Sequence, residues 1–187
     1  MPLTKLDEVA ALIVVDLQKG IVSVPTVHPT GEIIQRSATL ARAFRERKLP
    51  VVLVNVIGAA PGRVDTPRPN FAPPPGWADL APELDTQPSD YLVSKQRWGT
   101  FIGTDLDAYL RSRNVTQVFI TGISTSAGVE STARSAYDLG YHVVVVTDAV
   151  TDRNPEAHRH SIGAVFPRLA ESTTTADLLK HLASRSH

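Results

Sequence analysis

The 187-residue chain is 42% hydrophobic and 20% charged, with 19 basic and 19 acidic side chains, a composition typical of one soluble domain spanning residues 1–187. Because the formal net charge is zero, neither a nucleic acid nor an anionic membrane is expected as the main partner, since both attract a surplus of Lys and Arg. The absence of cysteine excludes disulfides, thiolate metal sites and a cysteine nucleophile.

The first predicted element is a strand at residues 11–15. This continuous apolar run is preceded by Asp7 and Glu8 and ends at Asp16, which favours a buried strand over a signal peptide. No run of about 18 apolar residues occurs anywhere, so no segment is expected to span a bilayer. The cytoplasm is the expected location.

Apolar runs and helical periodicity alternate along the rest of the chain. Strands are predicted at residues 51–57, 91–93, 117–120, 142–146 and 173–175. Helices are predicted at residues 32–48, 105–113, 129–139, 155–169 and 176–183, with Asn154 and Pro155 as cap and first-turn proline of the fourth. The alternation predicts an α/β fold in which a parallel sheet lies between two helical layers. Residues 11–15 belong near its centre, because a wholly apolar strand needs cover on both faces.

Residues 58–88 interrupt the alternation. They carry eight of the fourteen prolines and show neither helical nor strand periodicity. A loop of this length is either a lid or binding loop, or a surface excursion that contacts a partner. Phe71 and Trp77 place apolar surface in it, which favours a homodimer or a higher homo-oligomer.

Polar residues that close the predicted strands are the first candidates for chemistry, because ligands bind beyond the carboxyl ends of parallel strands. Asp16 suits acid/base work if burial moves its pKa, or it simply caps the turn. Lys95 and Arg97, followed by Trp98 and Phe101, suit an anionic, planar ligand. The alternative is a solvated basic turn whose two aromatic residues pack in the core.

The corner at residues 121–130 joins a predicted strand to a helix and is built from small residues, including Ser124 and Thr125. Its backbone N–H groups can face an anion or a developing oxyanion. A nucleophilic serine is a further hypothesis, because Asp148 and His158 follow in the chain order of a hydrolase triad. The G-x-S-x-G spacing of a nucleophile elbow is nevertheless absent.

Other cofactor and metal motifs are missing. The sequence has no G-x-G-x-x-G, no phosphate-binding G-x-x-x-x-G-K-[ST] and no H-E-x-x-H. His158 and His160 lie two residues apart on a predicted helix and therefore do not share a face. No cofactor and no metal are expected, and the expected ligand is a small molecule.

Four ordered segments together resemble the isochorismatase-like hydrolase family. They are VVDLQ at 14–18, KQRWGTFIGTDL at 95–106, GISTSAGVESTAR at 122–134 and GYHVVVVTDA at 140–149. The resemblance implies a doubly wound, six-stranded parallel sheet, an oligomer, and a catalytic Asp–Lys–Cys set at the strand ends. Asp16 and Lys95 match the first two positions, and Gly128 stands at the third, where most members carry the cysteine.

This departure from the family pattern divides the chemistry that the resemblance implies. The family's amidases attack a carbonyl with the cysteine thiolate, which a glycine cannot do. The Asp-x-His metal motif of nicotinamidases is also absent, since Asn55 and Ile57 occupy that region. Some isochorismatases instead work without the cysteine, and use the aspartate to protonate an enol-ether carbon before water adds. An aromatic residue is usual in them where Ser124 stands, so the substrate stays open.

The expected mechanism is attack by water with Asp16 as general acid. In this hypothesis Lys95 and Arg97 hold a substrate carboxylate, and Gln18 orients water or the ligand. Gly128 leaves space, and its N–H and that of Val129 face the ligand. The alternative is a non-catalytic, ligand-binding relative of the family, since loss of a nucleophile fits that reading too.

Overall fold

The computed structural model describes residues 3–66 and 73–184 and contains a six-stranded parallel sheet in the order β3-β2-β1-β4-β5-β6. The strands are β1 (Ala10–Val15), β2 (Val51–Val56), β3 (Tyr91–Lys95), β4 (Gln117–Ile123), β5 (His142–Thr151) and β6 (Glu171–Thr173). The expected α/β fold is confirmed, with β1 paired to β2 on one side and β4 on the other.

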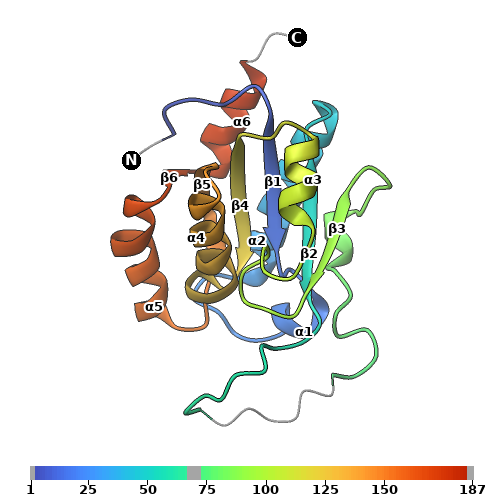
Figure 1. Cartoon of the computed structure of the whole chain (residues 1–187), viewed down its shortest axis with the longest axis vertical. Helices are drawn as coiled ribbons and strands as arrows, with labels where there is room; N and C mark the ends of the chain where they lie inside the picture. The colour runs from blue at the N-terminus through green and yellow to red at the C-terminus, as the bar shows by residue number, and fades with distance from the viewer. Residues whose placement is uncertain (1–2, 67–72, 185–187) are drawn as a thin grey trace.

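Helices cover both faces of this sheet (Figure 1). The α-helices of the described residues are α1 (Lys19–Val22), α2 (Thr30–Glu46), α3 (Leu106–Ser112), α4 (Glu130–Asp138), α5 (Pro155–His160) and α6 (Thr175–Ala183), of which α1 lies at the carboxyl edge of the sheet. None of them, within the described parts of the chain, combines the length and apolar character that a membrane crossing requires.

The apolar residues of β1 explain this three-layer arrangement. Leu12 and Val14 join the core shared with α2 and α6, whereas Ile13 and Val15 join the core shared with α3 and α4. Successive side chains of a strand point to opposite faces, so a continuously apolar strand needs both helical layers. Chain order reverses between β1 and β4, and their carboxyl ends therefore border the crevice where ligands of such folds bind.

Several predicted elements differ in extent from the observed ones, and β5 continues to Thr151, beyond the predicted end at residue 146. The helix expected at residues 155–169 is regular only to His160 and continues as a π-helical turn, Ser161–Val165, and a 3₁₀ turn, Phe166–Arg168, where Pro167 lacks the N–H that an α-helix needs. The last strand ends at Thr173 because Thr174 caps α6, its hydroxyl accepting a hydrogen bond from the Asp177 N–H at 3.2 Å.

The proline-rich connection between β2 and β3 returns underneath the carboxyl edge of the sheet (Figure 1). Residues 67–72, which include Phe71, lie outside the described residues. The returning limb pairs with the chain that follows β1: Leu80 forms an antiparallel bridge with Gln18, and the Gly20 N–H donates to the Trp77 carbonyl at 2.9 Å. This limb includes one helical turn, Pro82–Leu84. Trp77 therefore packs largely within its own chain.

Candidate active site

Three strands deliver Asp16, Lys95 and Gly128 to one cleft of about 540 Å³. Asp16 directly follows β1, Lys95 ends β3, and Gly128 lies in the π-helical turn Thr125–Val129 after β4. The Lys95 Nζ donates to the Asp16 Oδ2 at 2.7 Å. A Cβ atom at Gly128 would lie 3.0 Å from the same Oδ2, so the glycine backbone directly borders the carboxylate.

Asp16 is a buried acid with one oxygen held and the other open. Its backbone has a left-handed φ of 53°, a conformation that aspartate tolerates better than most residues. Oδ1 is buried and has no hydrogen-bond partner among the described residues. Burial raises the pKa of Asp16 to about 6, against the lowering effect of the Lys95 ammonium. About half of these carboxyl groups therefore carry a proton at pH 6, and about a tenth still do at pH 7.

The Lys95 side chain is buried, with 1% of it exposed, and its ammonium is hydrogen-bonded to groups of its own chain. Its ammonium donates to Asp16 and, at 2.8 Å, to the Trp98 carbonyl. Since Lys95 has three N–H donors, one is left for water or a ligand. Lys95 is thus placed to hold Asp16 rather than to bind a substrate carboxylate by itself.

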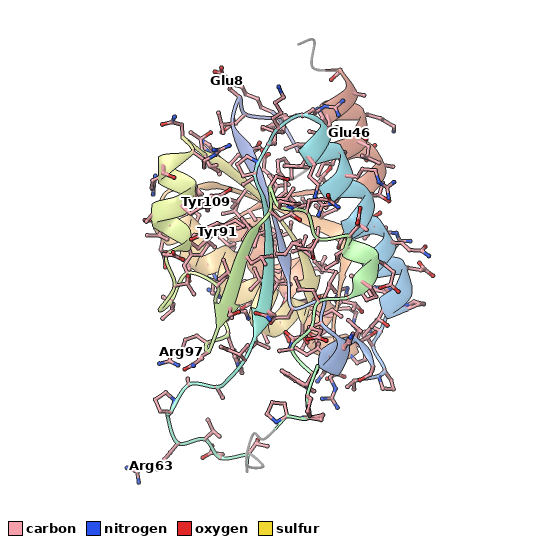
Figure 2. The ribbon with its side chains drawn as sticks, turned by 90° about the vertical axis from the view of Figure 1, so that its right-hand side faces the viewer. Glu8, Glu46, Arg63, Tyr91, Arg97 and Tyr109 are labelled. Atoms are coloured by element: carbon pink, nitrogen blue, oxygen red, sulfur yellow. The ribbon has the colours of Figure 1, made fainter. Side chains whose placement is uncertain are left out.

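The rest of the cleft is lined mainly by small or apolar residues. Besides Asp16, Lys95 and Gly128, the lining comprises Ile21, Val56, Gly58, Ala59, Ala60, Arg97, Trp98, Ile123, Ser124 and Ala127. Figure 2 shows Arg97 just beyond the end of β3, near the point where the long connection leaves β2. The Arg97 guanidinium donates a hydrogen bond to the Gln96 carbonyl at 3.0 Å, and within the described chain no carboxylate forms an ion pair with it. Its guanidinium is free to pair with an anionic ligand.

Three predicted ligand contacts lie elsewhere. Phe101 is buried in the core, stacked on Tyr141 at 5.9 Å between ring centroids. Val129 is also buried in the core, and its N–H donates to the Ser124 carbonyl at 3.1 Å instead of facing a ligand. Thr125 is fully buried, and its hydroxyl lies 2.9 Å from Nδ1 of His158. These three side chains do not line the cleft because packing and internal hydrogen bonds already use them.

Gln18 has a different task from the one expected. Its side-chain amide accepts from the Val56 N–H at 2.7 Å and donates to the Val56 carbonyl at 3.0 Å. It thereby continues the pairing between the end of β2 and the chain that leaves β1. The fully buried amide supports the wall of the cleft and does not orient water in it.

Among the described residues, no histidine contacts either serine of the corner. Ser126 donates its hydroxyl to Asp152 at 2.8 Å, and His158 contacts Thr125 rather than either serine. Asp148 accepts hydrogen bonds from the backbone N–H and the hydroxyl of Thr175, a residue that lies far along the chain from this corner. The described residues therefore do not assemble a Ser-His-Asp triad.

Residues 3–66 and 73–184 contain no cluster of three or more His, Asp or Glu side chains able to hold a metal ion.

Two buried threonines behind the cleft, Thr100 and Thr132, were not predicted from the sequence as functional residues. The only indication in the sequence is that each is a hydroxyl-bearing residue among small or apolar neighbours, Thr100 in the segment after β3 and Thr132 in α4.

Comparisons with known protein families, sequences and structures all point to the same family. Residues 10–177 match the isochorismatase domain. The isochorismatase family protein YwoC of Bacillus subtilis is 37% identical over 179 residues, which cover 92% of this chain and 93% of that protein. The structure of an isochorismatase family protein from Burkholderia thailandensis has a TM-score of 0.92 and 42% identity, and the match covers 96% of this chain and 98% of that one.

An enzyme of named activity is also similar. The ureidoacrylate amidohydrolase RutB of Pseudomonas syringae is 30% identical over 176 residues, which cover 78% of this chain and 72% of that enzyme.

Proposed function

The chain belongs to the isochorismatase family of hydrolases, and from this premise we propose that it hydrolyses a small, carboxylate-bearing substrate by attack of water, with Asp16 as the proton donor. The observation that carries the proposal is the buried Asp16–Lys95 pair in a cleft where the neighbouring turn presents Gly128 directly beside the carboxylate. No cofactor takes part in this proposal.

Water is the proposed nucleophile because the described residues place no activated nucleophile in the cleft. The sequence contains no cysteine, and we infer that Gly128 occupies the position where most family members carry theirs. The closeness of Gly128 to Asp16 supports this inference. Ser124 lines the cleft but has no histidine to take its proton among the described residues. A covalent acyl-enzyme is therefore not part of the proposed mechanism.

A pKa near 6 allows Asp16 to donate a proton to the substrate and to take one back within the same turnover. With an enol ether, protonated Asp16 transfers its proton to the enol carbon, and the electrons of the double bond form the new C–H bond. Water then adds to the oxocarbenium carbon and gives up a proton to the Asp16 carboxylate. Collapse of the resulting hemiketal breaks the C–O bond, and its hydroxyl proton passes to the leaving oxygen to release the alcohol, so one water is consumed and Asp16 is regenerated.

Arg97 is the proposed anchor of the substrate carboxylate. Its guanidinium is unpaired with any described carboxylate, and arginine binds carboxylates through two parallel N–H bonds. Lys95 contributes less to substrate binding than expected from the sequence, since Asp16 and the Trp98 carbonyl already hold its ammonium. The Trp98 ring and the small residues of the cleft then accommodate an apolar substrate body.

Two other functions compete with this one. A ligand-binding relative without catalysis fits a cleft that lacks a nucleophile, and a serine hydrolase would need Ser124 or Ser126 to be activated. The similarity to a ureidoacrylate amidohydrolase makes ureidoacrylate a second substrate candidate beside isochorismate.

Assays of the purified protein with isochorismate, ureidoacrylate and a panel of enol ethers, esters and amides test the proposal. For the substrate that is turned over, we expect kcat/KM to be highest below about pH 6 and to fall as pH rises, because the protonated form of Asp16 is the active one. Tight binding of a panel compound without turnover would establish the ligand-binding alternative. A profile that instead rises through pH 6 would assign Asp16 the role of base.

We also propose that the chain forms a homodimer or a higher homo-oligomer. β3 is an edge strand, and Leu92, Trp98 and Ile102 on it and on the turn after it are 59%, 68% and 56% exposed. Unpaired strand edges and exposed apolar side chains favour association. Tyr91 and Arg97 in Figure 2 locate this edge.

Sedimentation velocity at micromolar concentration is expected to show a dimer or larger species. The double variant Leu92→Lys/Ile102→Lys should sediment as a monomer, because two charges are costly to bury at an interface. Tyr137→Lys, which changes an exposed aromatic residue of α4, serves as the control and should keep the parent's state. A monomeric parent would contradict the proposal.

A further inference from the structure

Two buried threonines join the two sides of the cleft. The Thr132 hydroxyl donates to the Gly128 carbonyl at 2.6 Å. The same oxygen lies 2.9 Å from the Thr100 hydroxyl and accepts the Thr100 N–H at 3.2 Å. Both residues are fully buried. Thr132 therefore ties the turn that borders Asp16 to the segment that follows β3.

The segment after β3 is the one that orients Lys95. The Trp98 carbonyl, two residues before Thr100, accepts from the Lys95 ammonium at 2.8 Å. Between them, Gly99 lies so close to α4 that a Cβ atom there would be 3.2 Å from the Ser131 carbonyl oxygen. The position of the Trp98 carbonyl is thus fixed by contacts with α4, and Thr132 supplies the hydrogen bonds among them.

These contacts form a closed circuit around the acid. It runs from Asp16 to Lys95, to the Trp98 carbonyl, through Thr100 to Thr132, and back to Gly128, which borders Asp16. The side chains that form these hydrogen bonds are at most 5% exposed. Trp98 is an exposed residue, and it contributes only its backbone carbonyl. Buried networks of this kind hold their members in one arrangement.

We propose that Thr132 is a positioning residue for the Lys95–Asp16 pair: through Thr100 and the Trp98 carbonyl it holds the Lys95 ammonium against Asp16, and through Gly128 it fixes the opposite wall of the cleft. Lys95 and Arg97 are the charged groups that line the cleft with Asp16. β2, β4, α1 and the π-helical turn present uncharged residues there, among them Val56, Ile123, Ile21 and Ala127. A change in how Lys95 is held therefore has a direct effect on Asp16.

The variants Thr132→Val and Thr132→Ser test this role. Valine keeps the shape of threonine and removes the hydroxyl, whereas serine keeps the hydroxyl. A ¹³C NMR titration of the Asp16 carboxyl, assigned with Asp16→Asn, measures its pKa without a substrate. We expect Thr132→Val to raise that pKa by about half a unit or more, because a loosely held ammonium stabilises the carboxylate less. Thr132→Ser should stay within about 0.2 unit of the parent.

A matched control separates positioning from general loss of a buried hydroxyl bond. Ser37 and Thr121 form a second fully buried hydroxyl pair, at 3.0 Å, on the α2 side of the sheet. Thr121→Val should lower stability by a similar amount and leave the pKa of Asp16 unchanged. If Thr132→Val does not fold, Thr100→Val breaks the same circuit from the other side and should shift the pKa in the same direction.

An Asp16 pKa that is the same in the parent, Thr132→Val and Thr121→Val would overturn the inference. The activity readout rests on the proposed function, but the titration does not. A parent pKa near 4 would remove the proposed acid, whereas a raised parent pKa that Thr132→Val leaves unmoved would remove only the positioning role. With a substrate in hand, the falling limb of kcat/KM should move upward in pH by the same shift as the titration.

Discussion

Asp16→Asn is expected to lower kcat by about 10²–10⁴-fold, the usual contribution of general acid–base catalysis. Asparagine keeps the volume of the side chain, and its carbonyl can still accept the 2.7 Å hydrogen bond from Lys95. It has no carboxylic proton to transfer to the substrate. Since Arg97 and the apolar walls of the cleft are untouched, the dissociation constant of the substrate should change little. Single-turnover kinetics and equilibrium binding on the same preparation measure the two quantities separately.

Two serine variants are the controls for this experiment. Ser124→Ala and Ser126→Ala should each cost much less activity than Asp16→Asn, because neither serine contacts a histidine among the described residues and the Asp152 carboxylate that binds Ser126 has a lowered pKa, which makes it a weak base. A serine-directed phosphonate should leave no adduct on either residue. An Asp16→Asn enzyme as active as the parent, or a phosphonate adduct on Ser124 or Ser126, would refute the mechanism.

Gly122→Ala is expected to lower the free energy of unfolding by about 3–5 kcal/mol, the sum of backbone strain and overpacking. Gly122 has a φ of +118°, which residues with a side chain rarely adopt. Its added Cβ atom would lie 2.0 Å from the carbonyl oxygen of Val15, the residue directly before Asp16. Because Val15 and Gly122 are paired in the two central strands, relief of this clash requires β1 and β4 to move apart at the cleft.

Urea denaturation followed by circular dichroism measures this loss, and Gly31→Ala is the matched control. Gly31 lies in α2, and an added Cβ atom there meets nothing within 4 Å, so alanine should stabilise the protein by about 0.5–1 kcal/mol. A Gly122→Ala protein within about 1 kcal/mol of the parent would mean that the strand ends yield more easily than this packing implies.

The sequence alone determined the architecture and the residues that close its strands. Runs such as residues 11–15 are apolar without interruption, and only a strand covered on both faces buries every one of them. The order of strands and helices then determines that Asp16 and Lys95 meet at the carboxyl edge of the sheet. Both conclusions depend on burial periodicity and chain order, which are properties of the local sequence.

The tertiary structure decided which of the neighbouring side chains face the cleft. Trp98 and Phe101 are three residues apart in one turn, yet Trp98 lines the cleft and Phe101 stacks on Tyr141 in the core. Gln18 follows Asp16 by two residues and is used by the end of β2. Lys95 is held by Asp16 and by the Trp98 carbonyl, whose place depends on Thr132 in a helix more than thirty residues away. The direction of a side chain in an irregular turn depends on the partners that reach it from distant segments, and a sequence pattern carries no record of those partners.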